Sequence, residues 1–205
     1  MSNEGTRGTF IVFEGGDGSG KSTQSQRLAT RIGAIHTREP GGTPIGDALR
    51  ELVLDPERRE LADRTEALLM AASRAQHVAE VIEPALAGGA HVVCDRYVAS
   101  SLAYQGAGRG LGIDVVAELN RFATNDVMPD LTVLLEADPD AARKRLGTNL
   151  DRIEDAGRAL GDVVVATYRE LAAADPERWV VVPADGTIDE VAARVDAVIA
   201  ERCGL

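Results

Sequence analysis

Short hydrophobic runs alternate along the chain with longer segments whose hydrophobic residues recur at helical spacing. Runs rich in β-branched and aromatic residues predict strands at 9–13, 34–37, 91–94, 131–135 and 179–182. The clearest helical patterns cover 22–32, 64–87 and 188–202. Because strands that alternate with helices form parallel sheets, the pattern predicts an α/β fold with a five-stranded parallel sheet flanked by helices.

The pattern also predicts a single domain that covers 1–205. No linker rich in Pro, Gly or Ser and no abrupt change of charge divides the 205 residues.

One stretch, 147–161, differs from the rest: two glycines bracket a polar run that follows the basic residues Arg143, Lys144 and Arg145. It is interpreted as a short lid over a nucleotide, although an ordinary surface connection has the same composition.

Composition and charge narrow the possible partners. Hydrophobic residues make up 44% of the chain and aromatic residues only 3%, which indicates a core of mainly Ala, Val and Leu. The formal net charge is −11, from 22 basic and 33 acidic residues, so the overall field repels polyanions. We therefore expect no nucleic-acid polymer as a partner, and any phosphate must be bound locally.

Two further features concern location. The N-terminal stretch 1–8 is polar, and no hydrophobic run approaches the roughly 20 residues that cross a bilayer. The cysteines, Cys94 and Cys203, lack the spacing of a metal site and are interpreted as reduced thiols. We expect a cytoplasmic protein without a membrane partner.

The strongest chemical signal is the sequence GGDGSGKS at 15–22, which lies between a predicted strand and a predicted helix. Glycines let successive backbone N–H groups face a polyphosphate, and the following helix N-terminus adds positive potential. Lys21 can reach the β- and γ-phosphates, and Ser22 can ligate Mg²⁺. The predicted ATP-binding residues are Gly15, Gly16, Asp17, Gly18, Ser19, Gly20, Lys21, Ser22 and Thr23.

A carboxylate and an arginine follow the third predicted strand. Asp95 is the candidate for the carboxylate that a phosphate-loop enzyme needs beside magnesium, usually through a bound water. Arg96 is placed to hold a phosphate oxygen. Ser22 and Asp95 are therefore the predicted Mg²⁺ residues.

The segments outside the phosphate loop favour a small-molecule kinase. The chain has no Asn-Lys-x-Asp segment of the kind that reads guanine, and no long second module. Arg38 stands at a predicted strand end before a Pro-Gly-Gly turn, which suits recognition of an acceptor phosphate. Asp17 would repel a triphosphate if it pointed inward, so we expect it to face the acceptor.

Taken in order, these motifs resemble a known family. The segments that carry the likeness span nearly the whole chain: 14–23, 37–43, 74–76, 95–97, 103–106 and 150–154. Together they resemble the bacterial thymidylate kinases. The resemblance implies a P-loop NTPase fold and transfer of the γ-phosphoryl group of ATP to dTMP, giving dTDP for dTTP biosynthesis, with Mg²⁺ as the metal. It also implies a homodimer.

The resemblance assigns roles around the acceptor nucleotide. In this family the position of Asp17 binds the sugar 3′-hydroxyl, and the positions of Arg38 and Arg96 hold the acceptor phosphate. Tyr104 stands where a ribose 2′-hydroxyl would clash, which would select deoxyribose. The remaining predicted dTMP-binding residues lie around the base, with Arg74 reaching thymine O4: Met70, Arg74, Ser100, Ser101 and Gln105.

Two positions depart from the family's pattern. Met70 stands where a phenylalanine usually stacks on thymine, and its thioether contributes about 0.3–1.5 kcal/mol against an aromatic ring, so we expect somewhat weaker thymidine discrimination. Gly18 stands where some members carry a loop arginine, so the lid must supply that cation. It is assigned to Arg152, with support from Arg143, Lys144 and Arg145. The predicted catalytic residues are Lys21, Arg96 and Arg152.

Two other functions remain open from the residues alone. A deoxynucleoside kinase would use a hydroxyl acceptor and a carboxylate base, and two arginines placed for an acceptor phosphate weigh against it. A nucleotide-dependent switch or binding protein would hydrolyse ATP without any monophosphate. Acceptor-dependent turnover separates a kinase from the switch.

Overall fold

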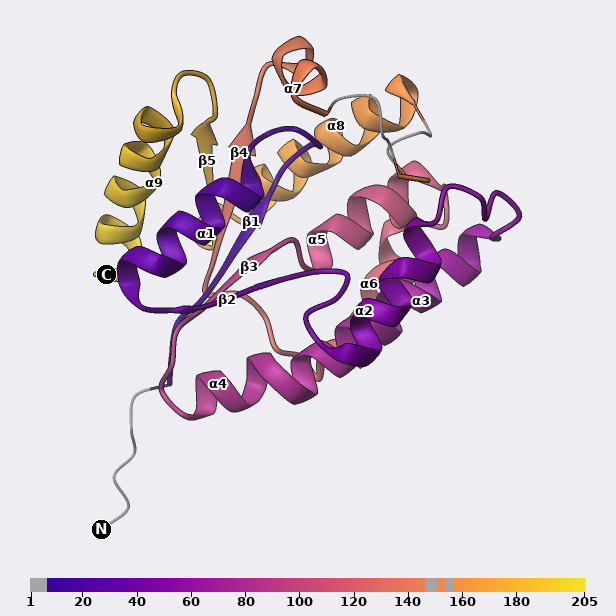
Figure 1. Cartoon of the computed structure of the whole chain (residues 1–205), viewed down its shortest axis with the longest axis horizontal. Helices are drawn as coiled ribbons and strands as arrows, with labels where there is room; N and C mark the ends of the chain where they lie inside the picture. Colours follow the sequence, from indigo (N-terminus) through magenta and orange to yellow (C-terminus); the bar gives the residue numbers. More distant parts are fainter. Residues whose placement is uncertain (1–6, 147–150, 154–156) are drawn as a thin grey trace.

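The protein forms a parallel β-sheet between two layers of helices (Figure 1). The computed structural model describes residues 7–146, 151–153 and 157–205. Five parallel strands lie in the order β2-β3-β1-β4-β5, which confirms the predicted sheet. Their bounds are β1 (Phe10–Glu14), β2 (Ile35–Arg38), β3 (Val92–Asp95), β4 (Leu131–Glu136) and β5 (Trp179–Pro183).

The strands begin within one residue of the predicted positions, and each continues one residue further. That last residue is charged in four of the five strands: Glu14 in β1, Arg38 in β2, Asp95 in β3 and Glu136 in β4. The register pairs Asp95 with both Phe13 and Arg38. The carboxyl edge of the sheet therefore gathers chemically active side chains that a search for hydrophobic runs leaves out.

The helices occupy nearly all the intervals between the strands. The described residues contain the helices α1 (Lys21–Ile32), α2 (Pro44–Leu54), α3 (Asp63–His77), α4 (Glu83–Ala87), α5 (Val98–Ser101), α6 (Ile113–Thr124), α7 (Pro139–Leu146), α8 (Arg158–Ala174) and α9 (Ile188–Cys203). Two π-helical segments, η1 (Val78–Ile82) and η2 (Leu102–Gly108), continue α3 and α5. The helix predicted at 64–87 is thus α3, η1 and α4 in direct succession, and it ends at Gly88.

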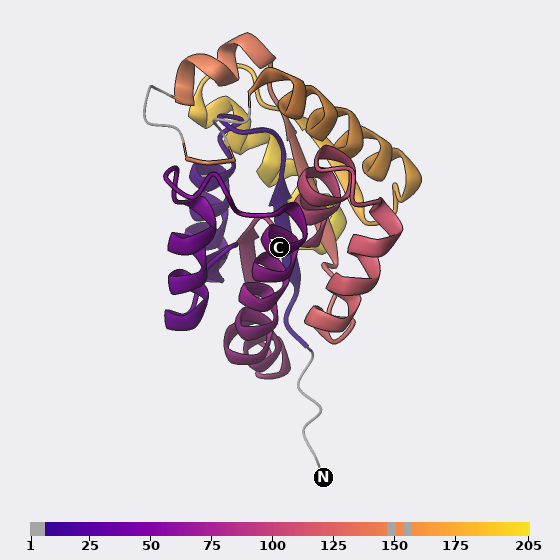
Figure 2. The ribbon, with the colours of Figure 1, turned by 90° about the vertical axis from the view of Figure 1, so that its right-hand side faces the viewer.

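Each face of the sheet is covered by its own set of helices. Leu28 of α1 and Val195 and Ile199 of α9 pack with Phe13 and Val133 on one face. On the opposite face, η1 and α4 cover β1 and β3, while α3, η2 and α8 cover the end near β4. Figure 2 shows this second layer in front of the sheet. None of the helices in the described ranges is long and apolar enough to cross a membrane.

Candidate active site

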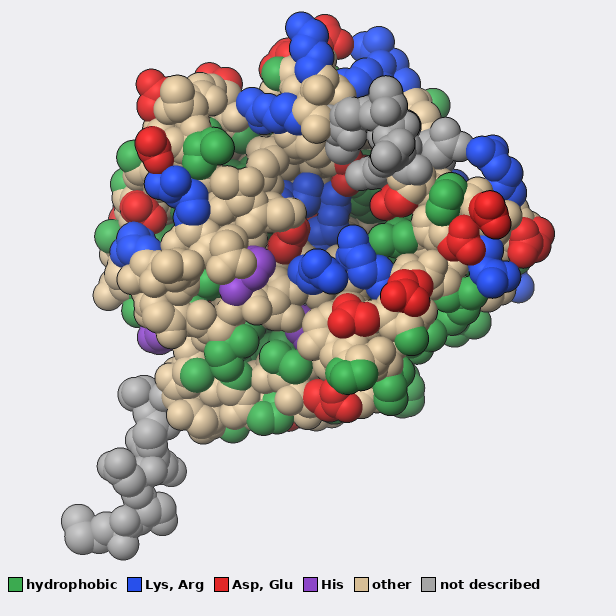
Figure 3. All heavy atoms as spheres, viewed as in Figure 1, with side chains coloured by type: hydrophobic (Ala, Val, Ile, Leu, Met, Phe, Trp, Pro, Cys, Tyr) green, Lys and Arg blue, Asp and Glu red, His purple; other side chains and the backbone are tan. Residues whose placement is uncertain are grey.

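A cleft of about 840 Å³ opens at the carboxyl ends of β1, β2 and β3. Figure 3 shows the hollow, in which basic side chains gather. It brings together most of the side chains predicted for both substrates: Asp17, Lys21, Ser22, Thr23, Arg38, Met70, Arg74, Asp95, Arg96, Ser100, Ser101, Tyr104 and Gln105. Ligands of α/β proteins usually bind at this edge of the sheet. The arrangement therefore offers neighbouring subsites for a nucleotide donor and an acceptor.

The phosphate loop wraps over the start of α1. Gly18 and Gly20 have φ angles of 76° and 94°, a region that favours glycine, and Gly20 precedes the first residue of the helix. Lys21 is nearly buried and its Nζ donates to the Gly16 carbonyl oxygen at 2.7 Å. Burial, reinforced by the charge of Arg96, lowers the pKa of Lys21 to about 8. A bound polyphosphate would restore the charged form.

The affinity for ATP is expected to fall as the pH rises through about 8. Free Lys21 loses its proton near that pH, whereas bound phosphate keeps the ammonium charged, so binding at higher pH requires uptake of a proton. Calorimetric titration between about pH 7 and pH 9, in buffers of different ionisation enthalpy, measures both effects. A Lys21→Met variant should bind weakly and without this pH dependence. Constant wild-type affinity across the range would contradict the assignment.

Ser22 and Asp95 meet at the entrance of the loop in a way that suits Mg²⁺. Ser22 Oγ lies 2.5 Å from Asp95 Oδ2, while Asp95 Oδ1 is buried and has no hydrogen-bond partner among the described residues. Magnesium prefers oxygen ligands and is usually held by one or two protein groups together with substrate phosphates. The described residues contain no group of three or more His, Cys, Asp or Glu side chains that could hold an ion alone. The pair therefore fits a metal delivered with ATP.

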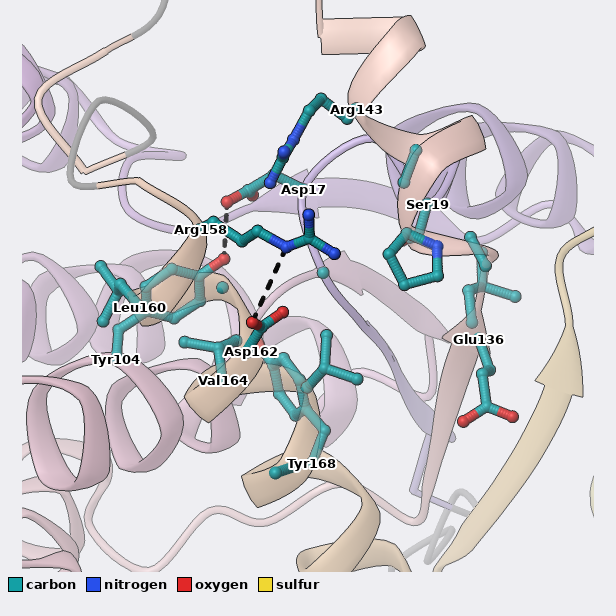
Figure 4. A pocket seen from close by; sticks show the side chains of 18 of the residues that line it. Asp17, Ser19, Tyr104, Glu136, Arg143, Arg158, Leu160, Asp162, Val164 and Tyr168 are labelled. Atoms are coloured by element: carbon teal, nitrogen blue, oxygen red, sulfur yellow. Dashed lines mark hydrogen bonds and ion pairs between the residues drawn. The ribbon is translucent and has the colours of Figure 1, made fainter.

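Asp17 of the phosphate loop forms hydrogen bonds with Arg96 and Tyr104. Figure 4 shows its contact with Tyr104. Arg96 Nη2 pairs with Asp17 Oδ1, and the Tyr104 hydroxyl donates to Asp17 Oδ2 at 2.8 Å. Burial alone would raise the pKa of Asp17, but the charges of Arg96 and Lys21 and the Tyr104 hydrogen bond lower it. Asp17 is thus held as a carboxylate that faces Arg96, on the side predicted for the acceptor.

Two further arginines extend this cationic wall. The Arg38 side chain is 58% exposed, and its Nη2 lies 3.9 Å from Asp47 Oδ1, so the guanidinium remains open to a ligand. Arg50 of α2 also lines the cleft, and its Nη1 donates to the Pro40 carbonyl oxygen at 2.9 Å. Burial and the charge of Arg38 lower the pKa of Arg50. Sequence reasoning missed Arg50, because an arginine within an amphipathic helix has no local signal.

Arg74 is fixed from all sides on the floor of the cleft. Its Nε donates to Glu39 Oε2 at 2.6 Å, Nη1 to Ser101 Oγ at 2.9 Å and to Asn120, and Nη2 to the Tyr97 carbonyl oxygen at 2.9 Å. Met70 lies one helical turn earlier on the same face of α3 and also lines the cleft. The two side chains together present a planar cation and an apolar surface, which suits a nucleobase.

Two of the other predicted base residues, Ser100 and Gln105, are held by buried carboxylates. Ser100 Oγ donates to Glu14 Oε2 at 2.7 Å. Gln105 Nε2 donates to Glu66 Oε1 at 2.8 Å. Each side chain therefore enters the cleft in an orientation that the protein sets before a ligand arrives.

Arg152 lies in a different environment from the one expected for a phosphate ligand. Its Nη2 lies 2.7 Å from Glu66 Oε2, and its Nε donates to the Val53 carbonyl oxygen at 2.9 Å. Glu66 is fully buried and also pairs with Arg109. Burial would raise the pKa of Glu66, but these hydrogen bonds lower it. The structure thus joins Arg152 to α3 and does not bring it to the phosphate loop.

The predicted lid lies partly outside the described residues, at 147–150 and 154–156. Of its remaining residues, 151–153 contain Arg152 and so lie beside Glu66 and Val53. Residues 158–161 form the first turn of α8. α7 packs against the loop closely: a Cβ at Gly18 would lie 2.2 Å from the Ala142 carbonyl oxygen. Arg145 Nη1 donates to the Gly18 carbonyl oxygen at 3.3 Å. Arg145 of α7, predicted only to support Arg152, is therefore the lid-side arginine that contacts the loop.

A second cavity of about 590 Å³ adjoins the loop between α7 and α8. Figure 4 shows Arg143 above it, Ser19 and Asp17 on the side of the loop, and Tyr104 and Tyr168 at its wall. Its remaining lining is largely apolar and comes from the end of β4 and from α8. Asp17 and Tyr104, which are joined by a hydrogen bond, line both this cavity and the acceptor side of the first cleft.

Comparisons with known proteins show which proteins the chain is similar to. The family model described as Thymidylate kinase matches residues 13–195. The chain is 46% identical over 198 residues to the thymidylate kinase of Lactobacillus delbrueckii subsp. bulgaricus, covering 91% of this chain and 93% of that one. It is 45% identical over 202 residues to the thymidylate kinase of Bifidobacterium longum, covering 95% and 98%. The crystal structure of thymidylate kinase from Ehrlichia chaffeensis has a TM-score of 0.77 at 30% identity, covering 94% and 99%.

Proposed function

The chain belongs to the thymidylate kinase family and is a dTMP kinase, and we propose the following roles for its residues. The observation that carries the proposal is the position of Arg96 and Asp17 directly beside Lys21, which sets an acceptor subsite against the phosphate loop. The acceptor phosphate has a second pKa near 6 and is already mostly dianionic at neutral pH. Transfer therefore requires alignment and charge stabilisation rather than a general base.

On the donor side, the loop backbone and Lys21 bind the phosphates of ATP. Ser22 and Asp95 would hold Mg²⁺, which would neutralise charge on the phosphate oxygens when it is bound with ATP. Because Lys21 already lies over the loop, it contributes its charge without a large rearrangement. The single domain would then place donor and acceptor on one rigid sheet edge.

On the acceptor side, Arg38, Arg50 and Arg96 hold the phosphate of dTMP. Asp17 accepts a hydrogen bond from the sugar 3′-hydroxyl, and the Tyr104 ring leaves no room for a 2′-hydroxyl. The base contacts would come from the remaining side chains of the cleft floor: Met70, Arg74, Ser100, Ser101 and Gln105.

Incubation of dTMP with Mg·ATP should give dTDP and ADP in equal amounts, and ADP without dTDP would contradict the proposal.

We assign the cation that meets the transferring phosphoryl group to Arg145, with Arg143 in support. Two observations favour α7 over Arg152: Arg145 reaches Gly18, and the Arg152 guanidinium is engaged by Glu66 and Val53. The close approach of α7 to Gly18 also explains why this loop carries no arginine at that position.

A deoxynucleoside kinase is the less favoured alternative. It would require a free carboxylate base near a hydroxyl acceptor, whereas Asp17 is paired with Arg96 and has a lowered pKa, which makes it a poor base. An ATP-dependent switch would not need the arginines that line the acceptor side.

The proposal also includes a cytoplasmic location and no nucleic-acid polymer as a partner.

We also propose that two copies pair through α3 and α6. These helices pack side by side and leave apolar side chains open: Leu68 is 57% exposed, Val115 66% and Phe122 89%. Apolar residues gathered on adjoining helices favour an interface, and the family resemblance implies a homodimer.

A Phe122→Glu variant is expected to be a monomer at concentrations where the wild-type protein is a dimer. A charge at the centre of an apolar interface would remain desolvated and unpaired in the dimer. Light scattering coupled to size-exclusion chromatography gives the mass, and Phe122→Leu is the matched control, which should stay dimeric. A dimer that persists in Phe122→Glu would exclude this face.

A further inference from the structure

A buried polar cluster lies behind Arg96, on the side away from Asp17. Its centre is Glu14, the last residue of β1, which is fully buried. Glu14 Oε1 accepts hydrogen bonds from the backbone N–H groups of Tyr97 and Ser100 at 2.9 and 3.1 Å. Glu14 Oε2 accepts from Ser100 Oγ at 2.7 Å and from the Tyr168 hydroxyl at 2.8 Å. The carboxylate is thus fully engaged without touching the cleft residues predicted for a substrate phosphate.

The cluster reaches Arg96 through its two hydroxyl groups. Arg96 Nη1 donates to the Tyr168 hydroxyl and to Ser100 Oγ, both at 3.1 Å. The other nitrogen, Nη2, pairs with Asp17. One side of the guanidinium is therefore fixed by a carboxylate in the cleft and the other by hydroxyls that Glu14 orients.

Proton positions follow from this geometry. Burial, opposed in part by Arg96, raises the pKa of Glu14, and burial together with the negative charge of Glu14 raises the pKa of Tyr168. Tyr168 therefore keeps its proton, which it can donate to Glu14, while its oxygen accepts from Arg96 and lies 2.8 Å from Ser100 Oγ. The backbone of Arg96 also has a φ angle of 72°, in a region that arginine rarely adopts.

Tyr168 comes from a distant part of the chain. It lies in α8, whose first turn, 158–161, belongs to the segment interpreted as a lid. It is buried between η2 and β4, and its hydroxyl is the group that joins α8 to Arg96. A phenylalanine would fill the same space, so packing alone does not account for the hydroxyl.

We propose that Tyr168, oriented by Glu14, is a positioning residue for the acceptor phosphate: it fixes the Arg96 guanidinium in the direction that binds dTMP and ties that direction to the placement of α8. The inference rests on the proposed function, specifically on Arg96 as a ligand of the acceptor phosphate. Tyr168 itself touches no substrate. Its effect should therefore be confined to ligands that carry the phosphate.

The test compares dTMP with thymidine, which lacks the phosphate, by calorimetric titration of full-length variants. Tyr168→Phe is expected to weaken dTMP binding about tenfold, the loss typical of a hydrogen bond to a charged group, and to leave thymidine binding unchanged. The Michaelis constant for dTMP should rise while that for ATP stays constant. Glu14→Gln keeps the shape of the side chain and removes the charge that orients both Tyr168 and Ser100, so it should weaken dTMP binding at least as much.

Tyr97→Phe is the matched control. The Tyr97 hydroxyl is also buried and donates to the Val127 carbonyl oxygen at 2.9 Å, away from Arg96. Its removal should cost similar thermal stability but leave binding of both ligands unchanged. If Tyr168→Phe changes the two ligands equally, or neither, or if Tyr97→Phe shows the same selective loss, the proposal is overturned.

Wild-type protein and Arg96→Lys separate this inference from the proposed function. The wild type should prefer dTMP to thymidine, and Arg96→Lys should reduce that preference. A wild type without the preference would overturn the acceptor assignment and this inference together. A normal wild type with an unchanged preference in Tyr168→Phe would overturn the role of Tyr168 alone.

Discussion

Replacing Lys21 with methionine is expected to lower kcat by about a thousandfold while leaving the fold intact. Lys21 supplies a preorganised charge at the phosphoryl group, and one such interaction is worth roughly 10²–10³ in rate. Methionine is similar in length and apolar, and the buried ammonium it replaces already has a pKa lowered to about 8, so we expect no loss of stability.

A coupled assay of ADP release measures this effect, with thermal denaturation as the check on folding. Arg31→Met is the matched control, since Arg31 lies on the same helix but pairs with Asp196 away from the cleft. It should retain wild-type turnover. A loss of less than about tenfold in Lys21→Met would contradict the role of Lys21 in the transition state.

Replacing Arg145 with alanine is expected to lower kcat by about a hundredfold or more, with a small change in the Michaelis constant for dTMP. Charge on the transferring phosphoryl group develops in the transition state, so a cation near Gly18 acts mainly on turnover. The same substitution at Arg152 should act differently. It would leave the buried Glu66 with fewer donors and cost about 1–3 kcal/mol of stability, because an unsatisfied buried group is costly.

Kinetics and thermal denaturation of the two variants, measured side by side, decide between these positions. The account predicts the larger loss of kcat in Arg145→Ala and the larger loss of thermal stability in Arg152→Ala. The reverse pattern would return the catalytic cation to Arg152, where the family resemblance alone had placed it.

The sheet could be predicted because its strands are buried on both faces. Parallel strands covered by helices read as nearly continuous hydrophobic runs, and the strands that contain Val12, Val93 and Val133 show this clearly. The same rule failed at strand ends, where Glu14 and Asp95 continue the strand but carry charge. The phosphate loop was predicted by its spacing, because its chemistry is local in the sequence.

The rest of the site depends on pairings between distant segments. Glu66 has the sequence pattern of one more surface acid in a chain with 27% charged residues. In the structure it is buried and bound by Gln105 of η2, Arg109 and Arg152. Arg50 and Tyr168 each lie in a helix with nothing to mark them until the fold sets them beside Arg38 and Arg96. Whether Met70 packs on thymine stays a prediction, although the structure places it in the cleft beside Arg74.

The most direct test of the central claim is the acceptor dependence of ADP production from Mg·ATP. The acceptors dTMP, dUMP, UMP and thymidine would be offered separately to the wild-type protein. The account predicts the fastest turnover with dTMP, slower turnover with dUMP, and negligible turnover with UMP and thymidine. Turnover with thymidine, or ADP release that needs no acceptor, would contradict it.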